Sequence, residues 1–268
     1  MQLNPELRNI IKQLLPEILR RKLAGLIYGW HGNYSSWGKA LKRSTGYDEG
    51  IIFDKAESAA RSVREGKAAY ERDSFLFDKI DYSFPLLSIL MWISARNGGK
   101  LNILDFGGSL GSTYLQHKMF LDSLREVNWC IVEQPEFVKR GINDFESDRL
   151  HFFHTMKECC ESQHIDAVLF SSVLQYLEEP QKVLELVMSM NIKYIIVDRT
   201  PLVVGNDRIT VQKVDPRIYR ASYPCWFFNR SKFLSYFHPD YQKVLEFEAA
   251  DRANVKSEFR GFLFSKIE

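Results

Sequence analysis

The chain has 268 residues, of which 45% are hydrophobic and 26% are charged, and its formal net charge is +2. This balance excludes an intrinsically disordered chain, and it is not that of a dedicated nucleic-acid binder, which carries a strongly basic surface. The length allows one large domain or two small ones. Aromatic residues make up 13% of the chain, and the question is whether these rings form a core or a binding site.

The cysteines and the apolar runs indicate the compartment. Four cysteines, at positions 130, 159, 160 and 225, form neither a CxxC pair nor a zinc-ligand spacing. They are typical of idle thiols in a reducing compartment. No apolar run approaches the roughly 20 residues of a membrane span, and charges interrupt the N-terminal stretch where a signal peptide would be apolar. We therefore expect a cytoplasmic protein, and no motif with ligand spacing predicts a metal.

The first part of the chain, residues 1–97, is predicted to be mostly helical. Apolar residues recur at helical spacing from Leu7 to Leu19, and Pro16 within this stripe predicts a kink. Three basic residues follow at 20–22. Such a helix can pack on its own domain, pack on a second subunit in a homodimer, or lie on a membrane surface, and the sequence leaves these open.

An aromatic loop over 29–37 follows, and residues 54–72 and 83–95 are predicted helices. Phe84 and Trp92 in the second helix are predicted core residues. We expect residues 1–97 to form a helical extension that either caps a substrate site or makes an interface.

From residue 98 onward, short apolar runs alternate with helical stretches, which predicts a parallel sheet covered on both faces. This second unit, 98–268, is predicted to be an α/β domain. Two final runs without a helix between them predict an antiparallel pair at the end of the sheet. The predicted strands are 101–106, 129–133, 150–154, 167–171, 194–198, 241–248 and 259–266, and the predicted helices are 112–126, 135–145 and 180–190.

A glycine-rich turn follows the first of these strands, and it carries the most information about function. Glycines let the backbone turn sharply and let a ligand approach closely, and the helix that follows offers unpaired N–H groups. Dinucleotide sites, hydrolase nucleophile elbows and methyltransferase cofactor turns all use this geometry. The turn reads Asp105-Phe106-Gly107-Gly108-Ser109-Leu110-Gly111.

Two of these three patterns fit poorly. The dinucleotide pattern G-x-G-x-x-G needs glycines at 109 and 112, where the chain has serines. The nucleophile elbow G-x-S-x-G matches 107–111 literally and calls for a triad such as Ser109, Asp198 and His238. An α/β-hydrolase, however, places several strands before its elbow, and here the preceding chain is predicted to be helical.

The turn is similar to the cofactor turn of class I methyltransferases, D/E-x-G-x-G-x-G, with Ser109 in place of the central glycine. The resemblance implies S-adenosyl-L-methionine (SAM) as cofactor, with the Asp105 carboxylate near its positively charged amino-acid end. It also implies that Glu133, at the end of the second strand, binds the ribose hydroxyls. The residues it assigns to the cofactor are Asp105, Gly107, Gly108, Ser109, Gly111, Glu133, Gln134, Ser171 and Ser172.

The run from Asp166 to Pro180 and the run from Lys193 to Thr200 resemble the fourth and fifth strands of the same enzymes. The resemblance implies a Rossmann-like, mostly parallel seven-stranded sheet with an antiparallel C-terminal strand and helices on both faces. The aromatic motif at 29–37 with Ser44–Asp48 is similar to a bacterial family of class I methyltransferases often associated with surface-polysaccharide gene clusters. That likeness implies O- or N-methylation of a small or glycan-related acceptor.

The candidates for proton transfer and for acceptor binding come from the ends of the fourth and fifth strands and from two aromatic loops, 28–37 and 219–228. We expect these two loops to meet over the carboxyl ends of the strands. A hydroxyl acceptor must lose a proton, so we select groups that can reach the carboxyl ends of the strands. The catalytic candidates are Asp198, Tyr176 and His31. Flat rings suit sugars, and the acceptor-binding candidates are Trp30, Tyr34, Trp37, Arg199, Tyr223 and Trp226. A non-catalytic binding protein with the same fold is the alternative function, and a hydrolase that uses Ser109 is the third.

Overall fold

The computed structural model describes residues 27–46, 49–216 and 218–267. The predicted helix over 7–19, with its three alternative contacts, lies outside the described residues. Among the helices that are described, none is long and apolar enough to cross a membrane.

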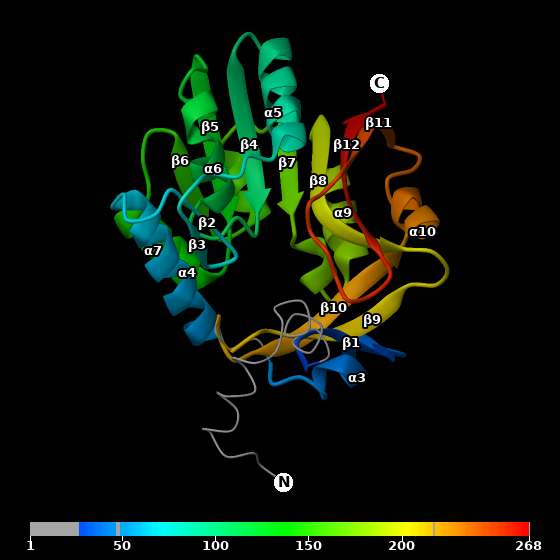
Figure 1. Ribbon diagram of the computed structural model, residues 1–268. Coiled ribbons are helices and arrows are strands. Elements are labelled where there is room, and N and C mark those ends of the chain that lie inside the picture. Colours follow the sequence, from blue (N-terminus) through cyan, green and yellow to red (C-terminus); the bar gives the residue numbers. More distant parts are fainter. Residues whose placement is uncertain (1–26, 47–48, 217, 268) are drawn as a thin grey trace.

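The centre of the molecule is a twisted sheet whose strand order is β6-β5-β4-β7-β8-β12-β11 (Figure 1). The first five strands in this order are mutually parallel, and β12 runs antiparallel to both of its neighbours. This order is that of the class I methyltransferase fold, which the sequence predicts. The strands are β4 (Lys100–Phe106), β5 (Glu126–Val132), β6 (Leu150–Phe153), β7 (Ala167–Ser171), β8 (Tyr194–Val203), β11 (Tyr241–Glu248) and β12 (Glu258–Lys266).

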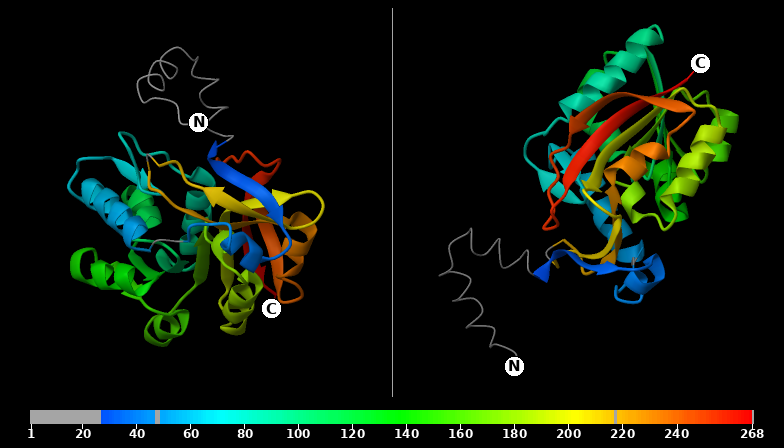
Figure 2. Two further views of the ribbon diagram at one scale, coloured as in Figure 1. Left: turned by 90° about the horizontal axis from the view of Figure 1, so that it is seen from below. Right: turned by 90° about the vertical axis from the view of Figure 1, so that its right-hand side faces the viewer.

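Helices cover both faces of the sheet (Figure 2). The reason is that β5 and β6 are added on one side of β4, whereas β7 and β8 are added on its other side. One face packs against α4 (Glu49–Arg64), α5 (Phe84–Arg96), α6 (Ser112–Leu121) and α7 (Pro135–Asp144). The other face packs against α8 (Met156–Ser162), α9 (Pro180–Ser189) and α10 (Arg230–Ser235). The reversal between β4 and β7 leaves a crevice at the carboxyl ends of these strands.

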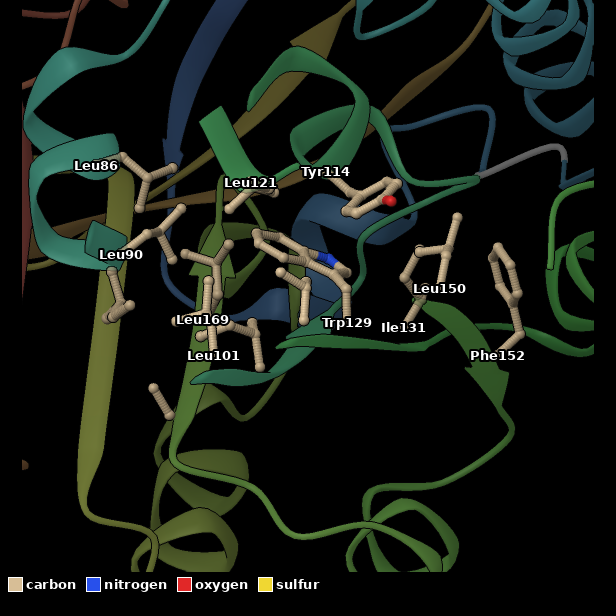
Figure 3. Packing of buried hydrophobic residues seen from close by; sticks show 14 of the residues in the cluster. Leu86, Leu90, Leu101, Tyr114, Leu121, Trp129, Ile131, Leu150, Phe152 and Leu169 are labelled. Carbon is tan, nitrogen blue, oxygen red and sulfur yellow. The ribbon is translucent and has the colours of Figure 1, made fainter. Parts of the chain in front are cut away.

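Trp129 on β5 lies at the centre of the first face (Figure 3). Its side chain is fully buried, and its ring centroid is 5.9 Å from that of Tyr114 on α6. Leu101 and Leu121 lie in the same cluster. This packing holds the helix that follows the glycine turn against the sheet, so the core directly positions that turn.

A second, smaller layer lies across the carboxyl ends of the sheet (Figure 1). Strands β1 (Gly29–Tyr34), β9 (Arg208–Lys213) and β10 (Ser222–Asn229) form it as an antiparallel set, with the short helix α3 (Trp37–Leu41) beside them. The layer joins the main sheet where the end of β10 pairs with the end of β8. The prediction that the segments 28–37 and 219–228 meet over this edge is confirmed, although both contain strands where loops were expected.

The N-terminal segment is less helical than predicted. The expected helix over 54–72 ends at Arg64, because Gly66 takes a φ of +71°, a left-handed conformation that ends helices. A hairpin follows, β2 (Tyr70–Arg72) and β3 (Phe75–Phe77). Helix α5 packs on the sheet, but Phe84 and Trp92 are 61% and 39% exposed, so their prediction as core is wrong. The buried stripe is instead formed by Leu86, Ile89, Leu90 and Ile93.

Candidate functional site

A cavity of about 990 Å³ opens at the carboxyl ends of β4, β5, β7 and β8. Small-molecule sites range from about 300 to 1,000 Å³, so this cavity has room for a large ligand or for two ligands side by side. The glycine turn forms one wall, the β1–β9–β10 layer forms the opposite wall, and the β2–β3 hairpin forms a third. The cavity therefore lies at the switch point of the sheet, where open α/β folds bind ligands.

The glycine turn approaches the cavity with bare backbone. Gly107 has a φ of +72°, and a Cβ there would lie 2.7 Å from the Val173 side chain. A Cβ on Gly108 would lie 2.6 Å from the Asp105 carboxylate. Side chains at these two positions would displace the turn, which is a physical reason for the two glycines. Both residues line the cavity, as predicted cofactor-binding residues should.

Ser109 also lines the cavity, and it takes the conformation that the expected glycine would take. Its φ is +54°, in the left-handed region where a residue with a Cβ is strained by about 1 kcal/mol. The backbone N–H of Ser109 lies close enough to the Glu133 carboxylate to lower its pKa. The substitution of serine for glycine thus keeps the turn and costs strain.

We expect Ser109→Gly to raise the free energy of unfolding by up to about 1 kcal/mol, because the φ strain is relieved. Chemical denaturation measures this difference. Affinity for S-adenosylhomocysteine, the product that SAM leaves after methyl transfer, should be unchanged, because glycine keeps the backbone N–H group of residue 109. A loss of affinity in Ser109→Gly would instead assign a binding role to the hydroxyl.

Asp105 is 1% exposed and lies beneath the turn, at the rim of the cavity. Its Oδ2 atom accepts a hydrogen bond from the indole Nε1 of Trp129 at 3.0 Å. Burial raises the pKa of this carboxyl to about 7, against the lowering effect of the Trp129 hydrogen bond. The carboxyl is therefore anchored to the core, and Gly108 covers it on the cavity side.

Glu133 follows β5 and lines the cavity beside the turn. Its Oε2 atom accepts from the backbone N–H of Gln134 at 2.7 Å, and Gln134 is the N-cap residue of α7. Burial raises the pKa of Glu133, while the N–H groups of Gln134 and Ser109 lower it. Glu133 and Gln134 thus occupy the place at the end of the second strand that the sequence predicts.

Gly111 lies outside the cavity lining. It is the N-cap of α6, with a φ of +97°, and a Cβ there would lie 3.3 Å from Leu150. The glycine therefore permits the turn into the helix and close packing on β6. Its prediction as a cofactor contact is not supported by this position.

Asp198 and its neighbours form the wall at the end of β8. Asp198 is 3% exposed, and its Oδ2 accepts from the Ser171 hydroxyl at 3.1 Å. Burial raises the pKa of Asp198 to about 6, and Arg199 and Ser171 oppose that rise. Ser171 and Ser172 both line the cavity. Asp198 and the two serines, which the sequence places at the ends of neighbouring strands, thus lie together at the cavity.

Arg199 faces the cavity but is engaged by two carboxylates. Its backbone takes a φ of +55° where the pairing of β8 with β12 is interrupted by a bulge, and bulges redirect side chains. Its guanidinium contacts Asp251 at 2.9 Å and Asp73 at 2.6 Å. Arg199 therefore joins the β2–β3 hairpin to the loop between β11 and β12. An acceptor bound by Arg199, as the sequence predicts, would have to compete with these two carboxylates for the guanidinium.

Aromatic and amide side chains form the wall opposite the glycine turn. The Tyr176 hydroxyl donates to Gln212 Oε1 at 2.8 Å, and the Tyr176 and Tyr223 rings meet edge to face at 5.4 Å. The hydroxyls of Tyr219 and Tyr223 are 3.2 Å apart. Burial raises the pKa of Tyr176 well above its usual value, so this hydroxyl stays protonated and cannot act as a general base. Trp30 and Trp37 complete this wall.

Besides Gly111, three predicted site residues do not line the cavity. His31 lies next to Trp30 on β1, and because Trp30 takes the cavity side, strand alternation turns His31 to the other face. The strand then changes register between His31 and Tyr34. Tyr34 packs instead with a small apolar cluster of α3 and β9. Trp226 stacks behind Trp37, with centroids 6.0 Å apart and an interplanar angle of 21°, and donates to the Leu177 carbonyl. The catalytic prediction for His31 and the acceptor-contact predictions for Tyr34 and Trp226 are therefore corrected.

The hydrolase triad is not assembled. Ser109 and Asp198 both line the cavity, but His238 is exposed and lies outside its lining. His154 is the histidine that the lining does contain, and its described hydrogen bond runs from its backbone N–H to Glu158. Without a base beside Ser109, the elbow pattern at 107–111 has no catalytic partner.

Glu71 on β2 is a cavity residue that the sequence analysis missed. It is 4% exposed, and its carboxylate accepts from the Ser112 hydroxyl at the start of α6 and from the Ser74 N–H at 3.1 Å. Burial raises the pKa of Glu71 to about 7. Gly66 is the signal that could have found it, because a glycine after a helical run indicates a helix end and leaves 70–77 free to form a hairpin.

No protein-family model matches the chain, and no curated protein matches its sequence. Among solved structures, an S-adenosylmethionine-dependent methyltransferase from Clostridium acetobutylicum aligns with a TM-score of 0.45 and 11% identity over 69% of this chain and 92% of that chain. The N-terminal domain of EvdMO1, solved in the presence of SAH and D-fucose, aligns with a TM-score of 0.45 and 15% identity over 83% and 98%.

CalS10, an amino pentose methyltransferase from Micromonospora echinaspora solved with SAM, aligns with a TM-score of 0.45 and 12% identity over 70% of this chain and 92% of that chain. At such identities these likenesses add nothing on activity. The strand order of the sheet assigns the fold.

Proposed function

We propose that this protein is a class I SAM-dependent methyltransferase that methylates oxygen or nitrogen on a small or glycan-related acceptor. One observation carries the proposal: the glycine turn after β4 and the acid after β5 line the same cavity at the switch point of a class I methyltransferase sheet. The three-dimensional placement matters more than the motif, because short glycine patterns recur by chance.

The residues of the turn fit the proposed cofactor. Gly107 and Gly108 line the cavity without side chains of their own, so a ligand can contact the backbone directly. The carboxylate of Glu133 lies beside this backbone and can accept hydrogen bonds from a pair of ribose hydroxyls. Ser171 and Ser172 border it on the β7 side. We infer that these residues hold SAM, whose sulfonium supplies an activated methyl group.

The remaining residues of the cavity would position the acceptor and receive its proton. Transfer of a methyl group depends mainly on a near-attack geometry, which the enclosed cavity supplies. Asp198 is the proposed general base, because its carboxyl faces the cavity with a pKa near 6 and is ionised at neutral pH. Ser171 orients it by a hydrogen bond to Oδ2. Tyr176 is assigned to acceptor positioning because its proton is held by Gln212.

The chemistry of the wall opposite the turn supports a sugar-like acceptor. Trp30, Trp37 and Tyr223 present aromatic rings, and Tyr176 and Gln212 add hydroxyl and amide groups. Aromatic faces combined with neutral hydrogen-bonding groups suit ligands with both apolar ring faces and hydroxyls. We propose that the β1–β9–β10 layer binds such an acceptor. An association with surface-polysaccharide biosynthesis extends the same proposal.

Isothermal titration with SAM and with S-adenosylhomocysteine (SAH) tests the cofactor assignment. Binding of both ligands with low micromolar or tighter affinity is the expected result. A folded protein that binds neither would overturn the methyltransferase proposal. Binding without methyl transfer over a panel of sugars, amino sugars and small phenols would favour the non-catalytic alternative.

We expect Trp37→Ala to raise KM about tenfold for the acceptor that is methylated in this panel, since an aromatic contact contributes about 0.5–1.5 kcal/mol beyond its buried area. SAH affinity should not change, because Trp37 lies across the cavity from the turn. Trp226→Ala is the matched control: it removes a ring that supports Trp37 without lining the cavity, so it should chiefly lower the melting temperature. Equal KM values for wild type and Trp37→Ala in folded proteins would remove Trp37 from the acceptor site.

The cytoplasm is the compartment we propose. All four cysteines are free thiols, and three of them are buried. Thiols that remain unpaired suit a reducing compartment.

A further inference from the structure

We propose that Glu71, from the β2–β3 hairpin of the N-terminal segment, binds the positively charged amino group at the amino-acid end of SAM. This inference rests on the proposed function and adds to it a cofactor ligand from outside the α/β domain. It makes the hairpin part of the cofactor site rather than a cover for the acceptor.

The placement of Glu71 carries the first step. The hairpin packs against α6, the helix that follows the glycine turn, as the ribbon in Figure 1 also shows. Glu71 reaches across this contact, and its Oε1 accepts from the hydroxyl of Ser112, the first residue of α6. The Ser74 N–H holds Oε2 from the other side at 3.1 Å. The carboxylate is thus fixed in the cavity wall at the start of the helix.

The charge balance around Glu71 carries the second step. Within the described parts of the chain, no Lys or Arg lies within ion-pair distance of its carboxylate, although Arg199 is close enough to lower its pKa. The guanidinium of Arg199 is instead held by Asp73 and Asp251. A carboxylate that is 4% exposed and lacks a cation is costly to keep ionised. A ligand cation in the cavity would remove that cost.

The third step concerns the other acids of the cavity. Asp73 and Asp251 are paired with Arg199, Glu248 is paired with Arg252, and Asp81 is exposed rather than buried. The sequence assigned Asp105 to this end of the cofactor. Its carboxylate instead accepts a hydrogen bond from Trp129 in the core and is covered by Gly108. Asp198 lies on β8 and is bonded to Ser171. Glu133 accepts from the N–H group of Gln134 at the end of β5. Glu71 is therefore the carboxylate placed to meet an ammonium group between the turn and α6.

A comparison of two ligands tests this assignment by binding alone. SAH carries the ammonium group, whereas 5′-methylthioadenosine has the same adenosine thioether without the amino-acid end. In Glu71→Gln we expect SAH affinity to fall about ten- to a hundredfold, as for loss of a charged hydrogen bond. Affinity for 5′-methylthioadenosine should stay within about threefold. Equal SAH affinity in wild type and a folded Glu71→Gln would overturn the proposal.

Asp105→Asn is the matched control, because it neutralises the competing carboxyl while asparagine can still accept from Trp129. We expect it to leave the ratio of SAH to 5′-methylthioadenosine affinity unchanged. A selective loss of SAH affinity in Asp105→Asn, with none in Glu71→Gln, would return the role to Asp105. If Glu71→Gln does not fold, Ser112→Ala replaces it, since that change removes the hydroxyl that orients Glu71 and should weaken SAH selectively.

The pH dependence gives a second readout. Burial is the main cause that raises the pKa of Glu71, and Asp73 on its own hairpin raises it further. The Ser112 hydroxyl on α6, the Ser74 N–H and Arg199 on β8 lower this pKa. Because the ionised form binds the ammonium, wild-type SAH affinity should rise as pH increases through about 7. Subtracting the Glu71→Gln profile removes the contributions of other buried acids, and parallel profiles would contradict the proposal.

Titration of wild type and Glu71→Gln with both ligands distinguishes the proposed function from the role of Glu71. If wild type binds neither SAH nor 5′-methylthioadenosine, the proposed function fails. If wild type binds both and Glu71→Gln binds both equally well, only the role of Glu71 fails.

Discussion

Replacing Asp198 with asparagine is expected to lower kcat by about 100- to 10,000-fold, the usual contribution of a positioned general base. The amide fills the same space and still accepts from Ser171, so the wall at the end of β8 should keep its shape. SAH affinity should remain within about threefold, because the loss concerns proton transfer. Steady-state kinetics with the acceptor found by the panel, together with titration of SAH, measure both quantities.

The pH profile separates this role from a structural one. Burial raises the pKa of Asp198 to about 6. Wild-type kcat should therefore fall as pH decreases below about 6, and Asp198→Asn should lack that decrease. Asp166→Asn is the control: Asp166 is also buried, but it lies at the opposite end of the neighbouring strand β7, where it accepts from Asn102. A kcat for Asp198→Asn that equals that of Asp166→Asn would exclude Asp198 as the base.

Replacing Asp105 with asparagine is expected to change the free energy of unfolding, relative to wild type, in a pH-dependent way: the variant should compare more favourably with wild type at pH 8 than at pH 5. Burial raises the pKa of Asp105 to about 7 in the folded state, whereas an unfolded aspartate titrates near 3.9. Between these values the folded state binds more protons, so stability falls as pH rises from about 4 to 7. From pH 5 to pH 8, this carboxyl should account for a loss of about 2–3 kcal/mol.

Asparagine does not titrate and can still accept from the Trp129 indole, so Asp105→Asn should escape that loss. Chemical denaturation of both proteins at pH 5 and pH 8 measures it, and the difference between them removes the similar contributions of Glu71 and Asp198. Trp129→Phe serves as the control: it deletes the donor but keeps the acid, so its pH slope should be at least as steep as that of wild type. Stabilities of wild type and Asp105→Asn that change in parallel would contradict the prediction.

The α/β core could be predicted closely because its signals are local. Apolar runs such as 101–106 and 167–171 are too short for helices and lie between helical stretches, and the structure has β4 and β7 there. The glycine turn is local too, since the left-handed φ values at Gly107 and Ser109 depend on the adjoining strand and helix. The positions of Asp198 and the two serines follow from the register of parallel strands, which brings their carboxyl ends to one edge.

The walls of the cavity could not be predicted in the same way. Strand β1 forms because it pairs with β9 from the other end of the chain, and its own residues, with two glycines, favour a loop. The exposure of Trp92 depends on which side of α5 meets the sheet. Arg199 was expected to anchor a substrate, but its two carboxylate partners come from a hairpin and a loop that lie far from it in sequence.

The sequence by itself determined the strands and helices of the α/β part along the chain, the glycine turn and the acid after β5, because these depend on short-range periodicity and on residues that adjoin along the chain. Only the tertiary structure decided which carboxyls are buried, which aromatic rings face the cavity and that Glu71 belongs to it. Burial and pKa are set by surroundings from several distant segments. A site built where such segments meet is therefore visible only once the chain is folded.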